Sequence, residues 1–211
     1  GKKIFTIQNG FDPSQKNPGM PLAEKFTITY PGVLYRGKRD PEPLFKTFER
    51  LISKGSLDPS DISIEFYGHK ENWLEDDARR YGLGEIVRIN GLISKEESIE
   101  KQRRSHLLLL LTWNHEEEKG VYTGKVFEYL AAQRPIISLG VSGGVVEELL
   151  MSTGAGLQAQ TQEDLERAIM DAYNEYKSQN TVSYHGLSSE IDKFSHIEMA
   201  RKFSTILDDL C

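Results

Sequence analysis

Five consecutive leucines, at positions 107–111, are the feature that most limits how this chain can fold. The run is flanked by His106 and Thr112 and is far too short to span a membrane. An apolar run of this length is typical of a strand that is buried on both faces in a parallel sheet. The polar segment 113–120 follows it, where a loop at the carboxyl end of the strand is expected and where ligands often bind.

The rest of the chain alternates short apolar runs with amphipathic segments. Strands are predicted at residues 26–30, 62–67, 86–89, 106–112, 135–139 and 156–159. Helices are predicted at residues 42–54, 72–81 and 95–104, after Gly124, and at residues 145–151, 165–176 and 196–210. This alternation indicates an α/β fold, a Rossmann-like, doubly wound parallel sheet with helices on both faces.

Composition limits the partners. The 211 residues, of which 38% are hydrophobic and 27% charged, indicate one soluble globular domain, or one such domain with a linker and a tail. A net charge of -6 argues against nucleic acid as the main partner, because binding to a phosphate backbone needs a basic face. The single cysteine, Cys211, fits a reducing compartment, so a cytoplasmic location is expected.

A helix start near Gly124 is the main candidate site. Apolar residues such as Val126 and Phe127 give this helix one buried face, and its first backbone N–H groups are free to bind an anion. Lys125 lies in the first turn, where a cation opposes the helix dipole, and it precedes Glu128 in the less favourable order for an ion pair. A bound phosphate would account for this lysine. The alternative is a solvated lysine–glutamate pair.

A basic turn, residues 32–41, follows the first predicted strand at the same end of the sheet. It begins at Gly32 and carries Arg36, Lys38 and Arg39. Because both segments follow parallel strands, they could bind one diphosphate together. The alternative is a solvated basic turn.

Residues 125–136 read Lys-Val-Phe-Glu-Tyr-Leu-Ala-Ala-Gln-Arg-Pro-Ile. They resemble the Lys-x-x-Glu-Tyr-x-Ala-Ala-x-x-Pro-hydrophobic motif of the retaining glycosyltransferases of family 4, which have the GT-B fold. Residues 7–12 resemble the family's Asn-Gly-x-Asp interdomain connection, and residues 26–32 resemble its first donor-domain strand. The resemblance implies a domain that binds a nucleotide sugar such as a UDP- or GDP-sugar. The full enzyme would transfer the sugar, with retention, to a polysaccharide or glycolipid.

The resemblance also implies roles for individual residues. Arg39 and Lys125 would bind the diphosphate as catalytic residues, and Glu128 would bind the ribose. Leu92 and Ile93, in the segment 90–93, would recognise the base through backbone groups. The alternative is that residues 90–93 form a plain turn between a strand and a helix. The further substrate-binding candidates are Gly32, Arg36, Lys38, Gly120, Val121, Tyr122, Thr123 and Gly124.

Two positions depart from the family pattern. Val33 stands where a basic residue commonly follows the glycine, and Arg36 or Lys38 could replace it. Gly120 stands where the family has the first acid of its Glu-x(7)-Glu pair. One of the three glutamates at 116–118 could substitute for it, or backbone N–H groups of the same loop could hold the sugar and β-phosphate.

The resemblance begins at the interdomain connection and Gly1 replaces an initiator Met, so an excised fragment is expected. We predict an interdomain linker at 1–24, a donor-binding domain at 25–190, and a C-terminal helix at 191–211 that packs toward the missing N-terminal acceptor domain. The fragment alone is expected to be inactive, and membrane contact is expected only through the missing half.

No metal or cofactor is implied, since the five histidines show no metal-ligand spacing. Two other classes of function stay open. The first is a non-catalytic nucleotide- or anion-binding α/β module, which the missing acid at Gly120 slightly favours. The second is a domain like that of a nucleotide-sugar epimerase, which would need acidic and histidine groups that this chain does not display.

Overall fold

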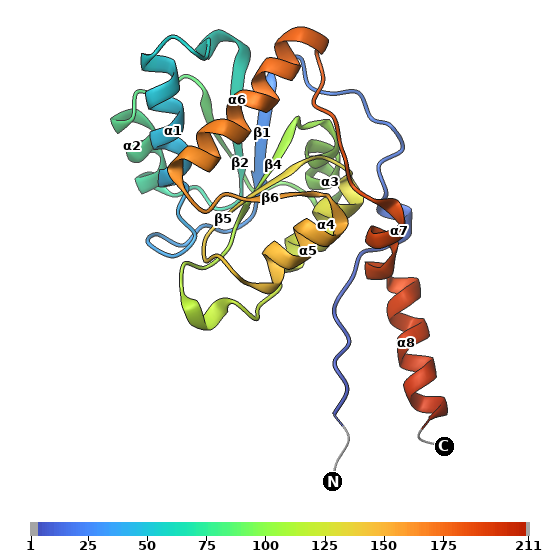
Figure 1. Cartoon of the computed structure of the whole chain (residues 1–211). Helices are drawn as coiled ribbons and strands as arrows, with labels where there is room; N and C mark the ends of the chain where they lie inside the picture. The colour runs from blue at the N-terminus through green and yellow to red at the C-terminus, as the bar shows by residue number, and fades with distance from the viewer. Residues whose placement is uncertain (1–3, 210–211) are drawn as a thin grey trace.

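The structure, a computed structural model, describes residues 4–209, which form one six-stranded parallel sheet with helices on both faces (Figure 1). The strands are β1 (Phe26–Pro31), β2 (Ile62–Tyr67), β3 (Val87–Gly91), β4 (Leu107–Leu111), β5 (Ile136–Leu139) and β6 (Gly156–Gln158). The helices are α1 (Glu42–Ser53), α2 (Asn72–Arg80), α3 (Lys95–Arg104), α4 (Gly124–Ala132), α5 (Val145–Thr153), α6 (Gln162–Gln179), α7 (Ser188–Ile191) and α8 (His196–Asp208). Short 3-10 segments are η1 (Pro13–Gln15), η2 (Pro59–Asp61), η3 (Glu116–Glu118) and η4 (Asp192–Phe194).

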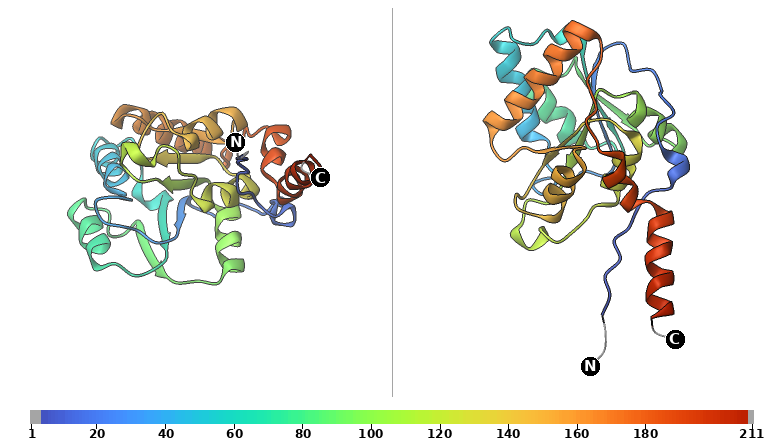
Figure 2. Two further views of the ribbon diagram at one scale, coloured as in Figure 1. Left: turned by 90° about the horizontal axis from the view of Figure 1, so that it is seen from below. Right: turned by 45° about the vertical axis from the view of Figure 1, so that its right-hand side comes forward.

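The strand order, β3-β2-β1-β4-β5-β6, is that of a doubly wound dinucleotide-binding fold. The predicted fold class is therefore confirmed. Helices α1, α2 and α6 cover one face of the sheet, and α3, α4 and α5 cover the other (Figures 1 and 2).

The five leucines of β4 are divided between the two hydrophobic cores. Leu107, Leu109 and Leu111 pack into the core under α1, α2 and α6. Leu108 and Leu110 pack into the core under α4 and α5. Because successive side chains of a strand point to opposite faces, a run without polar residues is what a strand covered on both sides requires.

The crossover between β1 and β4 creates the crevice in which a ligand could bind. These two strands are adjacent, but the chain leaves β1 toward α1 on one face and leaves β4 toward α4 on the other. Open α/β sheets bind ligands at such a point, beyond the carboxyl ends of the strands. Every segment predicted to bind the ligand follows a strand and lies at this edge.

Some predicted boundaries were wrong. Helix α6 begins at Gln162 and ends at Gln179, well outside the predicted 165–176, because a capping box of Thr161 and Asp164 starts it and Asn180, in the left-handed conformation, ends it. Strand β3 ends at Gly91 and so includes two residues that were predicted to form a turn. Helix α7 was not predicted.

Residues 10–24 contain the short 3-10 segment η1 but no strand or α-helix, and they are anchored to the domain. Phe11 is 2% exposed and exchanges backbone hydrogen bonds with the segment that precedes α8. Asn17 donates from its backbone and side chain to the last carbonyls of α4, at 2.9 and 3.0 Å. The linker is thus tied to the helix that carries the main candidate site.

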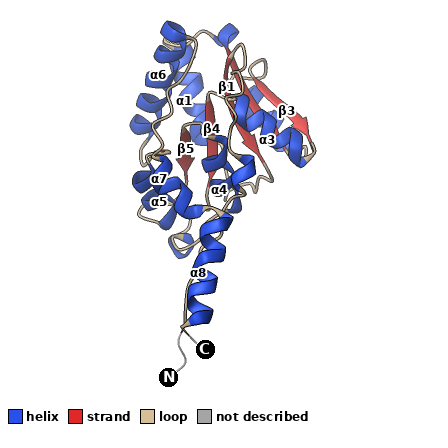
Figure 3. Cartoon of the chain, turned by 90° about the vertical axis from the view of Figure 1, so that its right-hand side faces the viewer, coloured by secondary structure: helices blue, strands red, loops and turns tan. Residues whose placement is uncertain are grey.

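Helix α8 and residues 4–10 leave the domain side by side (Figures 1 and 3). None of the described side chains of α8 is buried. The division into linker, donor-binding domain and C-terminal helix stays a prediction, and Gly1 and Cys211 lie outside the described residues. No helix within residues 4–209 combines the length and apolar character needed to cross a membrane.

Candidate functional site

The two predicted anion-binding segments meet at the carboxyl edge of the sheet. The side chain of Lys125, at the start of α4, lies against the backbone of Gly32, directly after β1. A Cβ atom at Gly32 would overlap Cε and Nζ of Lys125, and Gly32 has φ +144°, which favours glycine. The glycine therefore leaves room for the lysine head group.

Lys125 is only partly exposed, and no carboxylate neutralises it. Its Nζ lies 5.4 Å from the ring centroid of the buried Tyr30. Burial, followed by the nearby charge of Arg39, lowers the pKa of Lys125, while Glu128 opposes this shift. The described residues form no Lys125–Glu128 ion pair within 4.0 Å, so the simple paired-surface alternative does not describe this lysine.

The basic turn places its cations against aromatic rings. Arg39 Cζ lies 5.6 Å from the Tyr35 ring centroid and 6.0 Å from that of Trp113. Lys38 Nζ lies 4.5 Å from the Trp113 centroid. The Nε atom of Arg39 is buried without a hydrogen-bond partner in residues 4–209. Arg36 is directed elsewhere, with Cζ 5.7 Å from the Trp73 centroid, so it is separated from this group.

The start of α4 has unused hydrogen-bonding groups. Thr123 has the backbone conformation of an N-cap, but its side chain makes no capping bond, and its Oγ1 is buried without a partner among residues 4–209. Gly120 and Gly124 have open space where a side chain would be. Free N–H groups, open space and nearby cations form a site suited to a phosphate.

Aromatic residues of α4 fix its position. The hydroxyl of the buried Tyr129 donates to the carbonyl of Leu109 at 3.0 Å, which ties the helix to β4. Tyr122 packs against Phe127, with ring centroids 5.6 Å apart. Of the 120–124 candidates, Tyr122 therefore directs its ring to the core, and Val121 is 51% exposed.

Contacts with α5 hold the loop between β4 and α4. The backbone N–H of Val145 donates to the carbonyl of Lys119 at 2.8 Å, and a Cβ at Gly144 would overlap that carbonyl. Gly144 thus allows two backbone segments to meet. In the same loop, Glu116 pairs with Lys119 at 2.6 Å.

The third candidate, Leu92 and Ile93, follows β3 at the same edge of the sheet. Leu92 is 70% exposed, and Ile93 is partly exposed. Strand β2 lies between β3 and β1, so these residues flank the crevice at a distance from Lys125. Their backbone role stays a prediction. Glu128 is partly exposed, one turn beyond Lys125 on α4.

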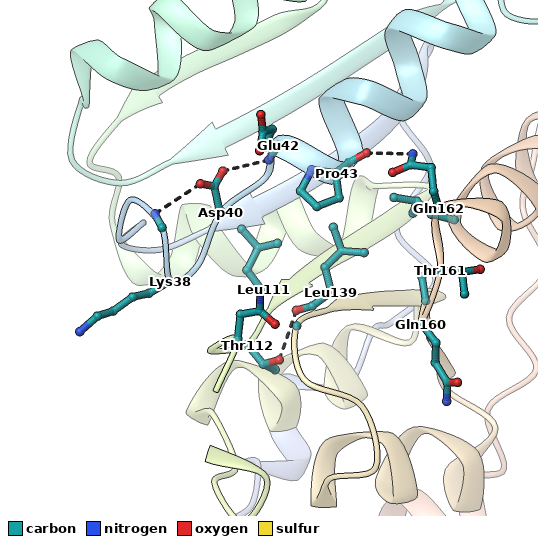
Figure 4. Close-up of a pocket in the computed structure, with 15 residues that line it drawn as sticks. Lys38, Asp40, Glu42, Pro43, Leu111, Thr112, Leu139, Gln160, Thr161 and Gln162 are labelled. Atoms are coloured by element: carbon teal, nitrogen blue, oxygen red, sulfur yellow. Dashed lines mark hydrogen bonds between the residues drawn. The ribbon is translucent and has the colours of Figure 1, made fainter. Parts of the chain in front are cut away.

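A pocket of about 390 Å³ lies beside the basic turn (Figure 4). Its polar groups mostly bind one another: Asp40 accepts from the backbone of Gly37 and Glu42 at 3.3 and 3.0 Å, and Gln162 donates to Pro43 O at 3.3 Å. The side chain of Lys38 points away from it in Figure 4. Two carboxylates and few free donors make this pocket less suited to a diphosphate than the Gly32–Lys125 crevice.

In residues 4–209, no three histidine, cysteine or acidic side chains come together as a metal site. The fold buries the side chain of His106. Its Nδ1 accepts from the backbone of Thr27 at 3.1 Å, and burial lowers its pKa to about 4. His115 is exposed. Metal independence stays a prediction.

No protein-family model matches the chain, and no curated protein is similar to it in sequence. Solved glycosyltransferases do share its fold. Anabaena HepE, solved with UDP and glucose, is 14% identical with a TM-score of 0.73 over 96% of this chain and 56% of its own. A Rickettsia africae glycosyltransferase is 15% identical, with a TM-score of 0.71 over 98% of this chain and 57% of its own.

The lipopolysaccharide outer core galactosyltransferase WaaB is 17% identical, with a TM-score of 0.68 over 99% of this chain and 56% of its own. The chain thus spans little more than half the length of the structures it matches. It has the Rossmann-like fold of one half of a GT-B glycosyltransferase, as the resemblance predicted.

Proposed function

We propose that this chain is the donor-binding half of a glycosyltransferase and binds a nucleotide-diphosphate sugar at the carboxyl edge of the sheet. The observation that carries the proposal is the cation group formed by Lys38, Arg39 and Lys125. None of the three has a carboxylate within 4.0 Å among residues 4–209. Arg39 lies near Lys125 at the start of α4, and Lys38 lies against Trp113, just beyond β4. A bound diphosphate would neutralise them.

This arrangement suits the chemistry of sugar transfer. When the bond from the anomeric carbon to the diphosphate breaks, negative charge builds on the diphosphate oxygens. Cations and N–H groups already aimed at those oxygens lower the barrier without moving. Lys125 and Arg39 supply the charge, and the free N–H groups of α4 supply hydrogen bonds. The proposal requires no metal.

The remaining residues extend the site along the nucleotide. Glu128 has no ion-pair partner within residues 4–209, and it could accept two ribose hydroxyls. The backbone at Leu92 and Ile93 would contact the base. HepE, which shares the fold, was solved with UDP and glucose, and this supports a uridine or related nucleotide as the first ligand to test.

We further propose that an acceptor-binding half covers α8 and residues 4–10. These elements leave apolar side chains in solvent, among them Phe5 at 47%, Ile197 at 59%, Phe203 at 51% and Leu207 at 60% exposure. An exposed apolar group of this kind marks a surface that another domain covers. Retention, a polysaccharide or glycolipid acceptor, and a cytoplasmic location belong to the same proposal.

The second candidate is a nucleotide-binding module that performs no transfer. Gly120 favours it, because open space stands where the related enzymes carry an acid, and Glu116 already pairs with Lys119. Turnover by a protein that contains both halves would separate the two candidates.

Calorimetric titration with UDP, GDP, ADP and uridine tests the proposal. We expect one diphosphate to bind selectively. We expect Lys125→Ala to lower the affinity for diphosphates far more than the affinity for the nucleoside. We expect Glu128→Gln to weaken the binding of both the diphosphate and its nucleoside by roughly 1–3 kcal/mol.

The exposed Lys54 and Glu163 offer matched controls, and Lys54→Ala and Glu163→Gln should leave affinity unchanged. If Lys125→Ala lowered the affinity for nucleoside and diphosphate equally, the diphosphate role of this lysine would be overturned. Failure of every nucleotide to bind would count against a donor site in this chain.

A further inference from the structure

The turn at residues 35–39 is closed on itself. The backbone N–H groups of Lys38 and Arg39 both donate to the carbonyl of Tyr35 at 2.9 Å, and Tyr35 and Arg39 form an antiparallel bridge. Gly37, with φ +74°, makes the reversal possible, and its N–H donates to Asp40. The two cations are therefore held on a short, defined loop.

A residue from a different part of the chain supports this loop. Trp113 lies just beyond β4, and its ring centroid is 6.2 Å from that of Tyr35. Lys38 Nζ lies 4.5 Å from the Trp113 centroid, and Arg39 Cζ lies 6.0 Å from it. Trp113 thus joins the loop after β1 to the loop after β4, the two sides of the crevice.

The aromatic contacts are weaker than a salt bridge to a phosphate. A cation over an exposed ring gains only a modest attraction, whereas a diphosphate offers charge-assisted, bidentate hydrogen bonds. The ring can therefore hold a cation in place without competing with the ligand. A carboxylate at the same position would hold the cation more tightly and would also repel a diphosphate.

We infer that Trp113 is a positioning residue for the diphosphate site, whose ring keeps Lys38 and Arg39 at the crevice in the free protein. This inference rests on the proposed function, since it assigns the two cations to a diphosphate. It adds a residue that no motif pointed to. It also makes Trp113 a reporter, because a diphosphate that binds the cations beside the ring changes the charge around the indole.

The test compares Trp113→Leu and Trp113→Phe with the unchanged chain in titrations with UDP, GDP, ADP and their nucleosides. We expect Trp113→Leu to weaken diphosphate binding about 3- to 5-fold and nucleoside binding less than 2-fold, while Trp113→Phe keeps both affinities within about 2-fold. If Trp113 only stabilised the fold, Trp113→Leu would weaken the binding of diphosphate and nucleoside alike, and that result would overturn the inference.

Fluorescence gives a second readout. The chain has two tryptophans, so Trp73→Phe leaves Trp113 as the single emitter. The diphosphate should change this emission, the nucleoside should not, and Lys38→Met should reduce the change. Diphosphate binding with no change in Trp113 emission would contradict the inference alone. Failure of all diphosphates to bind the unchanged chain would overturn both the inference and the proposed function.

Discussion

At the amino end of the sheet, Arg103 and Arg134 donate to backbone carbonyls of the protein, whereas at the carboxyl end Arg39 and Lys125 lie against aromatic rings. Arg134 binds the carbonyls of Arg103 and Met20, each at 2.7 Å, and Arg103 binds the carbonyl of Gln15 at 2.8 Å. These contacts fasten the linker. Arg39 and Lys125 make no such bond among residues 4–209.

The difference separates cations that stabilise the fold from cations that are available to a ligand. A guanidinium bonded to two partly buried carbonyls cannot be removed without leaving those acceptors without their charged donor. A cation that is partly buried without a partner costs stability and is kept for another reason. The following experiments test this contrast, from the largest expected effect to the smallest.

Arg134→Leu should lower the free energy of unfolding by about 3 kcal/mol, because two carbonyls lose a charged donor. Urea denaturation would measure the change. The control is Arg167→Leu, which removes only an exposed pair with Asp164 and should cost less than about 0.5 kcal/mol. A similar small loss for both variants would show that the amino-end arginines do not fasten the linker.

Gly32→Ala should lower the free energy of unfolding by about 2 kcal/mol and also weaken diphosphate binding. The new methyl group would meet the Lys125 head group, and the backbone would be strained at φ +144°. Gly55→Ala is the control for strain alone, since Gly55 has φ +70° and open space around it. Diphosphate affinity that survives Gly32→Ala would contradict the role of Lys125.

The stability of the protein should fall between pH 6.5 and pH 4 through His106, which stays neutral in the folded state because burial lowers its pKa to about 4. The unfolded chain takes up a proton below about pH 6.5, so unfolding is favoured as the pH falls, by a total on the order of 2 kcal/mol. Urea denaturation at a series of pH values measures this.

In the same series, His106→Gln should flatten the pH dependence, and replacement of the exposed His185 by glutamine should not. An unchanged slope in His106→Gln would assign the effect to other groups.

Lys125→Met should leave the free energy of unfolding within about 0.5 kcal/mol or raise it, because no ion pair is lost and a buried charge is removed. This is the opposite of the expectation for Arg134. A loss of 2 kcal/mol or more in thermal or urea unfolding would make Lys125 a structural residue and remove the contrast between the two ends.

The sequence predicted the fold because the pattern of apolar residues carries it. The leucines of β4 have no polar member, and this alone requires cover on both faces of the sheet. The convergence of Gly32 and Lys125 was also predictable, since both follow adjacent parallel strands. The start of α6 is marked in the sequence by the Thr161-x-x-Asp164 capping signal, whereas its end depends on the left-handed conformation of Asn180.

The aromatic partners of the cations could not be predicted. Tyr30 reads as a strand residue and Trp113 as a loop residue, and nothing local shows that Lys125 and Lys38 lie against them. Likewise, a glycine in a turn does not reveal what approaches it, and only the structure shows that Gly144 meets the backbone of Lys119. Such contacts join segments distant in the chain, and a single sequence holds no local signal of them.

The most direct test of the central claim is a crystal structure of the chain with UDP. The account predicts the diphosphate between Gly32 and the start of α4, within hydrogen-bond distance of Lys125 and Arg39, with the ribose at Glu128. UDP bound instead in the 390 Å³ pocket beside Asp40, or with its diphosphate away from Lys125, would contradict it.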